Sequence, residues 1–349
     1  MTISTLLKQP RLYTATLILL LSGMILFSAC GSSETQEQEA DVVEVTATHN
    51  AEENKHLYEM STHEFPMGWT TFEFSNASPY DHFFLIWKVP EEGLQALGEN
   101  ESLVDLWHRS ITEPFQNAYD PYINGDIAFD EFTNNLVGTI SETAPWFLDP
   151  GAQFMGGPGF TAAGATSATT VNLEPGRYVV ECYVKNEEEI FHSYIGMLDQ
   201  FTVTDETSDK MEPQPTHTVS ISSEEGIQSD SVLSAGSHVF EIFYEDQTTY
   251  EHMQGHNVQL VKLSDKDDQD LLNELSVWMD WRQPGSLVNR APEGAEFMGG
   301  SMEMPQGQTA YFHADLQPGD YAWIAEVPNP AEHDMLKTFT IPGEPNSGD

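Results

Sequence analysis

The sequence predicts a mainly β protein built from two tandem Greek-key β-sandwiches, each with a helical insertion. Short runs of β-branched and aromatic residues alternate with Pro-Gly and other turn signals, which is typical of sandwiches. Two motifs recur 143 residues apart. They are Phe154-Met-Gly-Gly157, which returns as Phe297-Met-Gly-Gly300, and Leu173-Glu-Pro-Gly-Arg-Tyr178, which returns as Leu316-Gln-Pro-Gly-Asp-Tyr321. The chain is therefore predicted to contain two copies of one module.

Residues 1–29 have the layout of a secretory signal peptide. Lys8 and Arg11 precede an apolar run that ends in small residues before Cys30. The sequence Leu26-Phe27-Ser28-Ala29-Cys30 resembles a bacterial lipobox, so we expect cleavage before Cys30 and lipidation of its thiol. A plain cleaved signal or an uncleaved anchor is the alternative. These features predict a protein in the cell envelope, anchored by lipid to a membrane on its periplasmic or outer-membrane side.

The remaining boundaries follow from composition and from the repeat. Residues 30–41 lack apolar periodicity and are predicted to be a flexible tether. The first module is predicted at 42–204, a polar linker with prolines at 205–216, the second module at 217–342, and a tail at 343–349. The expected strands of the first module are Val42 to Thr48, Trp69 to Phe74, Phe83 to Val89, Thr169 to Leu173, Tyr178 to Val184 and Phe201 to Val203.

The insertions follow the third β segment of each module and carry apolar residues at helical spacing. They are expected to cover one end or edge of each sandwich. The residues concerned are Leu103, Leu106, Trp107, Phe129, Phe132 and Leu136 in the first module, and Leu271, Leu272, Leu275 and Trp278 in the second.

The charge of the chain limits its partners. Without Lys8 and Arg11, the mature chain keeps 11 basic residues against 56 acidic ones, a formal charge of −45. Such acidity excludes nucleic acid as a partner, because binding to phosphates needs basic side chains. Acidity spread over the whole chain resembles the solvated surface of a halophile's protein, with a specific basic partner as the alternative.

Three soft or borderline metal ligands lie close together in the sequence. Cys182 is the only cysteine apart from Cys30, and His192 and Met197 follow it before the next β segment. A thiolate, imidazoles and a weak axial methionine form the ligand set of blue copper sites. The alternative is that Cys182 is a small core residue, as buried cysteines often are.

The same residues resemble the ligand loop of the cupredoxins, the plastocyanin and azurin family. In that family a strand ending in Tyr-x-x-x-Cys is followed by histidine and then by Gly-Met, as Tyr178, Cys182, His192 and Met197 are here. Nine residues separate Cys182 from His192, more than the family usually has. The resemblance implies that His82 supplies the second imidazole. It implies one copper ion held by His82, Cys182, His192 and Met197, with His192 at the solvent edge as the exit for electrons.

The two modules differ at two positions that matter in the cupredoxin pattern. Phe83 stands after His82 where cupredoxins often have an asparagine that bridges the ligand loops. The second module keeps Asn257 after His256, but Ala325 replaces the cysteine, so it cannot form a thiolate site.

The predicted function is a lipid-anchored, extracytoplasmic copper-binding electron-transfer protein with a redox partner protein. Two alternatives remain open. One is a metal-free binding or assembly module that uses the same fold. The other is Cu(I) storage or delivery by histidine and methionine residues of the second module, among them His252, His256 and Met335. The sequence contains no Gly-x-Ser-x-Gly elbow, phosphate loop or His-Glu-x-x-His motif, so we expect no enzyme.

Overall fold

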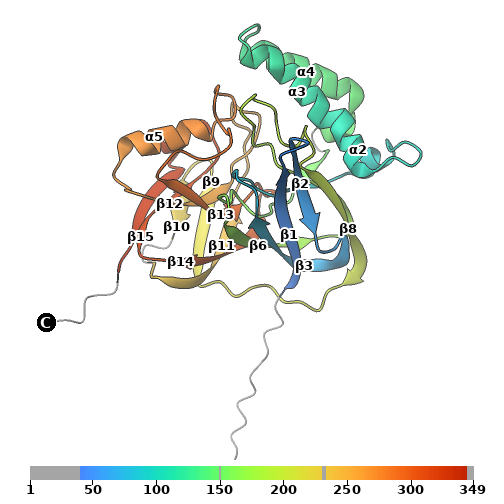
Figure 1. Cartoon of the computed structure of the whole chain (residues 1–349). Helices are drawn as coiled ribbons and strands as arrows, with labels where there is room; N and C mark the ends of the chain where they lie inside the picture. Colours follow the sequence, from blue (N-terminus) through green and yellow to red (C-terminus); the bar gives the residue numbers. More distant parts are fainter. Residues whose placement is uncertain (1–39, 149–150, 230–232, 344–349) are drawn as a thin grey trace, which may run out of the picture. The chain divides into compact units, whose positions relative to one another are not determined.

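The strands of the described residues form two sheets (Figure 1), which confirms the predicted mainly β class. The structure is a computed structural model that describes residues 40–148, 151–229 and 233–343. One sheet has twelve strands and the other has four, and together they fit two tandem β domains. The predicted signal peptide and Cys30 lie outside the described residues.

The first half of the chain contributes eight strands to the larger sheet. They are β1 (Asp41–Asn50), β2 (Lys55–Met60), β3 (Glu64–Asn76), β4 (Leu85–Lys88), β5 (Gln153–Phe154), β6 (Thr166–Leu173), β7 (Gly176–Glu181) and β8 (Leu198–Thr207). The sheet order runs β6-β3-β8-β7-β4-β5, with β1 also paired to β3 and β2 paired to β1. All six expected strands are present, and β2 and β5 add to them.

Strand β3 belongs to both layers of the first sandwich. Its first residues, Glu64 to Met67, pair with β8, whereas Gly68 onward pairs with β6. The register shifts at Pro66/Met67, and Gly68 has a φ of +128°, a conformation that a residue with a Cβ rarely adopts. Gly68 therefore sits at the corner where one strand passes from one layer to the other, as strands at sandwich corners do.

The second half of the chain also has eight strands. Its strands are β9 (His217–Ser222), β10 (Gly226–Ser229), β11 (Gly236–Tyr244), β12 (Val258–Leu263), β13 (Ala295–Ser301), β14 (Thr309–Leu316), β15 (Gly319–Ile324) and β16 (Leu336–Ile341). Strands β13-β12-β15-β16 form the four-stranded sheet, while β10-β9-β11-β14 extend the large one. The halves join where β14 pairs antiparallel with β6, with Tyr311 opposite Thr170. One continuous sheet therefore runs through both halves.

Helices occupy the predicted insertions. Between β4 and β5 lie α1 (Glu91–Leu94), α2 (Leu103–Trp107), the π-helix η1 (His108–Thr112), α3 (Glu113–Ile123), α4 (Phe129–Thr143) and the short 3-10 helix η2 (Pro145–Phe147). The second half has α5 (Gln269–Trp278) and the 3-10 helix η3 (Pro330–His333). Helices α3 and α4 lie side by side (Figure 1). Within the described residues, no helix is long and apolar enough to span a membrane.

The helices pack through the apolar stripes that the sequence predicts. On α4 the buried residues are Phe132, Leu136 and Ile140, spaced four residues apart on one helix face. On α5 they are Leu271, Leu272, Leu275 and Trp278. Each helix thus adds its apolar side to the core while its charged side faces solvent.

Candidate metal centre

The register of three neighbouring strands brings the predicted ligands together. Strand β7 lies between β4 and β8, antiparallel to both. Glu181, at the end of β7, is opposite Leu85 on one side and Leu198 on the other. The start of β4, the end of β7 and the start of β8 therefore coincide at one edge. Residues just outside these ends, including Cys182, must lie near one another.

The ligand atoms themselves converge. Cys182 Sγ is 3.6 Å from His82 Nδ1, and His82 Nδ1 is 3.3 Å from His192 Nδ1. All three residues are fully buried. Met197 is also fully buried and borders the cysteine, since the Cys182 backbone N–H donates to the Met197 carbonyl at 3.3 Å. The structure thus gathers the thiol and both imidazoles, and it places the backbone of Met197 beside that of Cys182.

These separations suit a shared metal ion. Metal–nitrogen and metal–sulfur bonds of about 2.0–2.3 Å put two ligands of one ion roughly 3–4 Å apart. The pKa of both His82 and His192 lies well below the usual range. Burial is the main cause, and repulsion from neighbouring imidazoles adds to it. Both rings are therefore neutral, the state that binds metal. A thiol with two neutral imidazoles is a donor set that favours copper.

Hydrogen bonds hold the first histidine in place. Ser78 Oγ lies 2.8 Å from His82 Nε2, which leaves Nδ1 as the ring nitrogen that faces Cys182. The Asn76 side chain donates to the carbonyls of Tyr80 and Thr161, at 2.7 and 2.8 Å, and so closes the loop that carries His82. Such outer contacts fix ring orientation at metal sites.

The cysteine sulfur faces backbone donors. Burial raises the pKa of Cys182 to about 12, and hydrogen bonds from the Phe83 and Val184 amides oppose that rise. Phe83 lacks the side-chain amide of the asparagine that was expected at this position from the family resemblance. Its backbone N–H still contacts the sulfur. A buried thiolate at this point needs a cation beside it, which a bound metal would provide.

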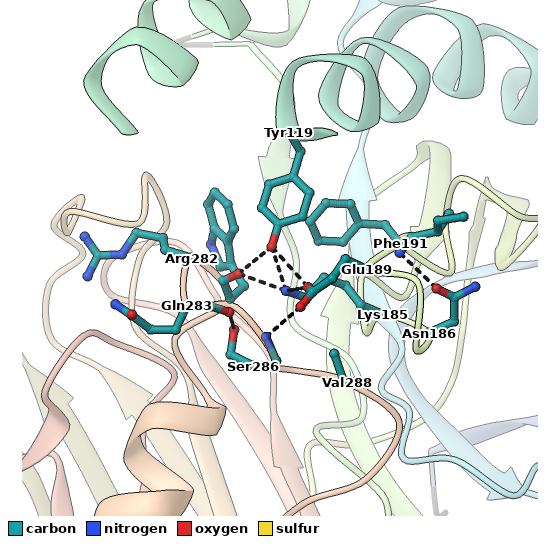
Figure 2. Close-up of polar contacts among 12 residues, drawn as sticks. Tyr119, Lys185, Asn186, Glu189, Phe191, Arg282, Gln283, Ser286 and Val288 are labelled. Atoms are coloured by element: carbon teal, nitrogen blue, oxygen red, sulfur yellow. Dashed lines mark hydrogen bonds and ion pairs between the residues drawn. The ribbon is translucent and has the colours of Figure 1, made fainter. Parts of the chain in front are cut away.

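A buried ion pair explains the long spacing between Cys182 and His192. After Val184 the chain makes an excursion and returns, so that the His192 N–H donates to the Val184 carbonyl at 2.8 Å. Figure 2 shows the anchor of this excursion, the Lys185 side chain. Its Nζ donates to Glu189 at 2.5 Å, to Tyr119 Oη at 2.7 Å and to the Trp281 carbonyl at 3.2 Å.

The same anchor ties the ligand loop to the rest of the chain. Tyr119 belongs to α3, and Trp281 follows α5 in the second half. The backbone of Lys185 adds two bonds to that half, donating to Leu287 at 2.7 Å and accepting from Asn289 at 2.9 Å. Residues 185–191 are therefore a fixed hairpin that returns His192 to the cysteine, and the extra length is compatible with a compact site.

A third histidine, which the sequence analysis missed, covers the site. His56 of β2 stacks on His192 with ring centroids 3.7 Å apart and an interplanar angle of 16°. Side-chain nitrogens of His56, His82 and His192 lie within 4.8 Å of one another. His49 of β1 pairs with His56 across the hairpin and stacks on it at 4.6 Å. The only sequence signal is a pair of histidines that face each other once the hairpin register is known.

The His56 stack corrects one expectation. His192 was expected at the solvent edge, but it is fully buried, and His56 lies over its ring. The hairpin β1–β2 adds a layer between this ligand and solvent. His49, which is half-buried, is the outermost imidazole of the stack.

We expect His56 to act as a cover for the site and not as a ligand. A phenylalanine keeps an aromatic ring stacked on His192, so His56→Phe should weaken Cu(II) binding by at most about tenfold, the lower end of outer-contact effects. His82→Ala should weaken it by more than about 100-fold. Copper titration of both variants, with the exposed His63→Phe as control, measures this. Equal losses in His56→Phe and His82→Ala would make His56 a ligand.

The described residues of the second half do not reproduce the cluster. Ala325 occupies the position of Cys182 in the repeat and is fully buried. His256 and His252 each approach a backbone carbonyl, of Asp246 at 3.0 Å and of Glu326 at 2.7 Å. Met335 accepts a hydrogen bond from Tyr250 at 3.8 Å. These histidines and this methionine have structural partners of their own.

No protein-family model matches the chain, and no curated protein matches it. Among solved structures, it is similar to auracyanin B, with 13% identity over 38% of this chain and 94% of that one and a TM-score of 0.26. It is also similar to dithionite-reduced auracyanin from the photosynthetic bacterium Roseiflexus castenholzii, with 17% identity, coverages of 48% and 98% and a TM-score of 0.22. A multicopper oxidase gives 8% identity, coverages of 86% and 88% and a TM-score of 0.22.

Proposed function

We propose that this protein is a copper-binding electron-transfer protein with one copper site in its first half. The observation that carries the proposal is the convergence of Cys182 Sγ, His82 Nδ1 and His192 Nδ1 in a fully buried place. Copper held by these atoms would supply reversible one-electron exchange. Met197 would be the fourth, weak ligand.

The residues around the ligands suit that task. Ser78 orients His82, and the amides of Phe83 and Val184 face the cysteine sulfur. The Lys185 anchor fixes the loop that carries His192. Ligands held in this way need to move little when the charge of the site changes, and their burial excludes water that would compete for the ion. The chain thus supplies a rigid, dry pocket.

The route by which electrons leave differs from the one expected. His56 lies on His192, and His49 lies on His56, so these stacked rings lead from the pocket toward the surface. We propose that a redox partner protein approaches this hairpin. The chain is strongly acidic, so a partner with a basic face would be attracted at low ionic strength.

We also propose that the protein is located at the cell envelope. Lipidation of Cys30 would hold the protein at a membrane of the cell envelope, with residues 30–41 as a tether between anchor and sheet. Labelled palmitate that enters the full chain and fails to enter Cys30→Ser is the measurement for this part. Labelling that persists in that variant would overturn it.

Reversible redox cycling tests the function. The chain from residue 31 onward should take up one Cu(II), lose its colour on addition of ascorbate and regain it with ferricyanide, because the rigid pocket holds both oxidation states. Visible absorption over repeated cycles measures this. Release of copper on reduction would favour delivery over electron transfer, and absence of stoichiometric copper would refute both.

A metal-free binding role is the second candidate. The observation that favours it is a cavity of about 610 Å³ between the helical insertion and the strands, which the copper proposal does not use. The two roles are compatible in one chain.

A further inference from the structure

The helical insertion and its neighbours line a partly open, mostly apolar cavity of about 610 Å³ beside the candidate metal centre. Helices contribute Ile111, Phe115, Leu136 and Ile140 to its wall, and strands β4 and β5 contribute Trp87 and Phe154. The second half closes it with His252 and Trp281. This volume is within the range of small-molecule sites, which are mostly apolar with a few polar groups.

His252, which lines the cavity, has an unused hydrogen-bond acceptor. His252 Nε2 lies 2.7 Å from the Glu326 carbonyl oxygen, which can only accept, so Nε2 carries the proton. Burial lowers the pKa of His252 to about 4, so the ring is neutral. Its Nδ1 therefore has a free lone pair. This atom is buried and has no hydrogen-bond partner among the described residues.

Trp281, which also lines the cavity, has an unused donor. Trp281 Nε1 is buried and has no partner within the described part of the chain. The residue as a whole is only 2% exposed. An indole N–H can only donate. Buried polar atoms normally have partners, so an acceptor and a donor without protein partners are available to a group bound in the cavity.

We propose that this cavity binds an uncharged, flat aromatic molecule that carries one hydroxyl or amide group. Such a group donates to His252 Nδ1 and accepts from Trp281 Nε1, while the ring lies among aromatic side chains such as Trp87, Phe115 and Phe154. An anionic ligand is disfavoured because no lysine or arginine of the described residues lines the cavity, whereas the Glu181 carboxyl does. The Glu181 oxygens already accept from Trp87 and Trp107, at 2.7 and 3.3 Å.

The position of the cavity gives the ligand a place next to the candidate copper site. Glu181 and Tyr183, which flank Cys182 in the sequence, and Ser193, which follows His192, all line it. Their neighbours Cys182 and His192 carry the sulfur and nitrogen atoms of the candidate copper site. The binding site does not depend on copper, so it can be tested without the metal.

The test uses 2-naphthol and 2-methoxynaphthalene as probes with the metal-free chain from residue 31 onward. Both have the same ring system, but only 2-naphthol can donate. We expect 2-naphthol to bind once per chain in calorimetry, at least tenfold more tightly than the ether. In His252→Leu this preference should fall to less than threefold, because the acceptor is gone. In Trp281→Phe the naphthol affinity should fall at least threefold.

A cavity-filling variant keeps the proposal testable if either polar variant misfolds. Leu136→Trp puts a larger side chain into the cavity from α4 and should abolish naphthol binding. Val277→Trp, at an exposed position on α5, is the matched control and should bind normally. Equal affinity for both probes, binding that survives Leu136→Trp, or no binding by the folded wild-type chain would each overturn the proposal. None of these outcomes depends on the proposed function, which the copper titration tests separately.

Discussion

Replacing Cys182 by serine should abolish any intense visible absorption of the copper-loaded protein. That absorption requires charge transfer from a thiolate to Cu(II), and Cys182 is the only free cysteine among the described residues. A serine hydroxyl is a far poorer ligand for copper, so Cu(II) affinity should fall by more than about 100-fold. Absorption spectra and competitive titration of the wild type and the variant measure both effects.

A second variant separates ligand loss from damage to the core. Ala325 is fully buried at the equivalent position of the second half, so Cys182→Ala should also be compatible with the fold. Both variants should keep the circular dichroism spectrum of the metal-free wild type. A variant that stays folded and still gives the intense band would show that Cys182 is a core residue, not a ligand.

Replacing Lys185 by methionine should cause the largest loss of stability. The Lys185 side chain is fully buried, and its removal leaves the Glu189 carboxylate, which is 19% exposed, without its cation. Breaking a buried ion pair on one side costs about 3–5 kcal/mol, and the partial exposure of Glu189 points to the lower end. Urea unfolding of the metal-free protein measures this change in the free energy of unfolding.

Two controls show whether the ion pair is responsible. Lys185→Met combined with Glu189→Gln removes both charges and should recover part of the loss, because no unpaired charge remains. Lys55→Met breaks the exposed pair with Glu53 and should leave stability unchanged. The Lys185→Met variant should also bind copper more weakly, since the loop that carries His192 loses its anchor. Full stability in this variant would contradict the role assigned to the loop.

Local sequence patterns were sufficient to predict most of the fold. Short runs of β-branched and aromatic residues predicted β3 and β6, and helical spacing predicted α4 and α5, because each of these helices buries one apolar stripe. The corner at Gly68 was not predicted, since it depends on β3 pairing with β8 before the glycine and with β6 after it. The β6–β14 pairing that joins the halves was likewise missed, because it forms between residues far apart in the chain.

The candidate site could be predicted only in part, for the same reason. Cys182, His82 and His192 followed from ligand chemistry and from the family resemblance. His56 reaches the site only through the register of the β1–β2 hairpin, which no local pattern of the sequence specifies. The long loop after Cys182 looked like a departure from the ligand pattern. Its length is explained by the contacts of Lys185, whose partners Tyr119 and Trp281 lie on distant segments.

The most direct test of the central claim is X-ray absorption at the copper edge of the protein loaded with one equivalent of copper. We expect one short copper–sulfur distance together with two nitrogen neighbours at about 2 Å, and loss of the sulfur contribution in Cys182→Ser. Copper surrounded by nitrogen and oxygen alone, with a spectrum that Cys182→Ser leaves unchanged, would contradict a site built on Cys182, His82 and His192.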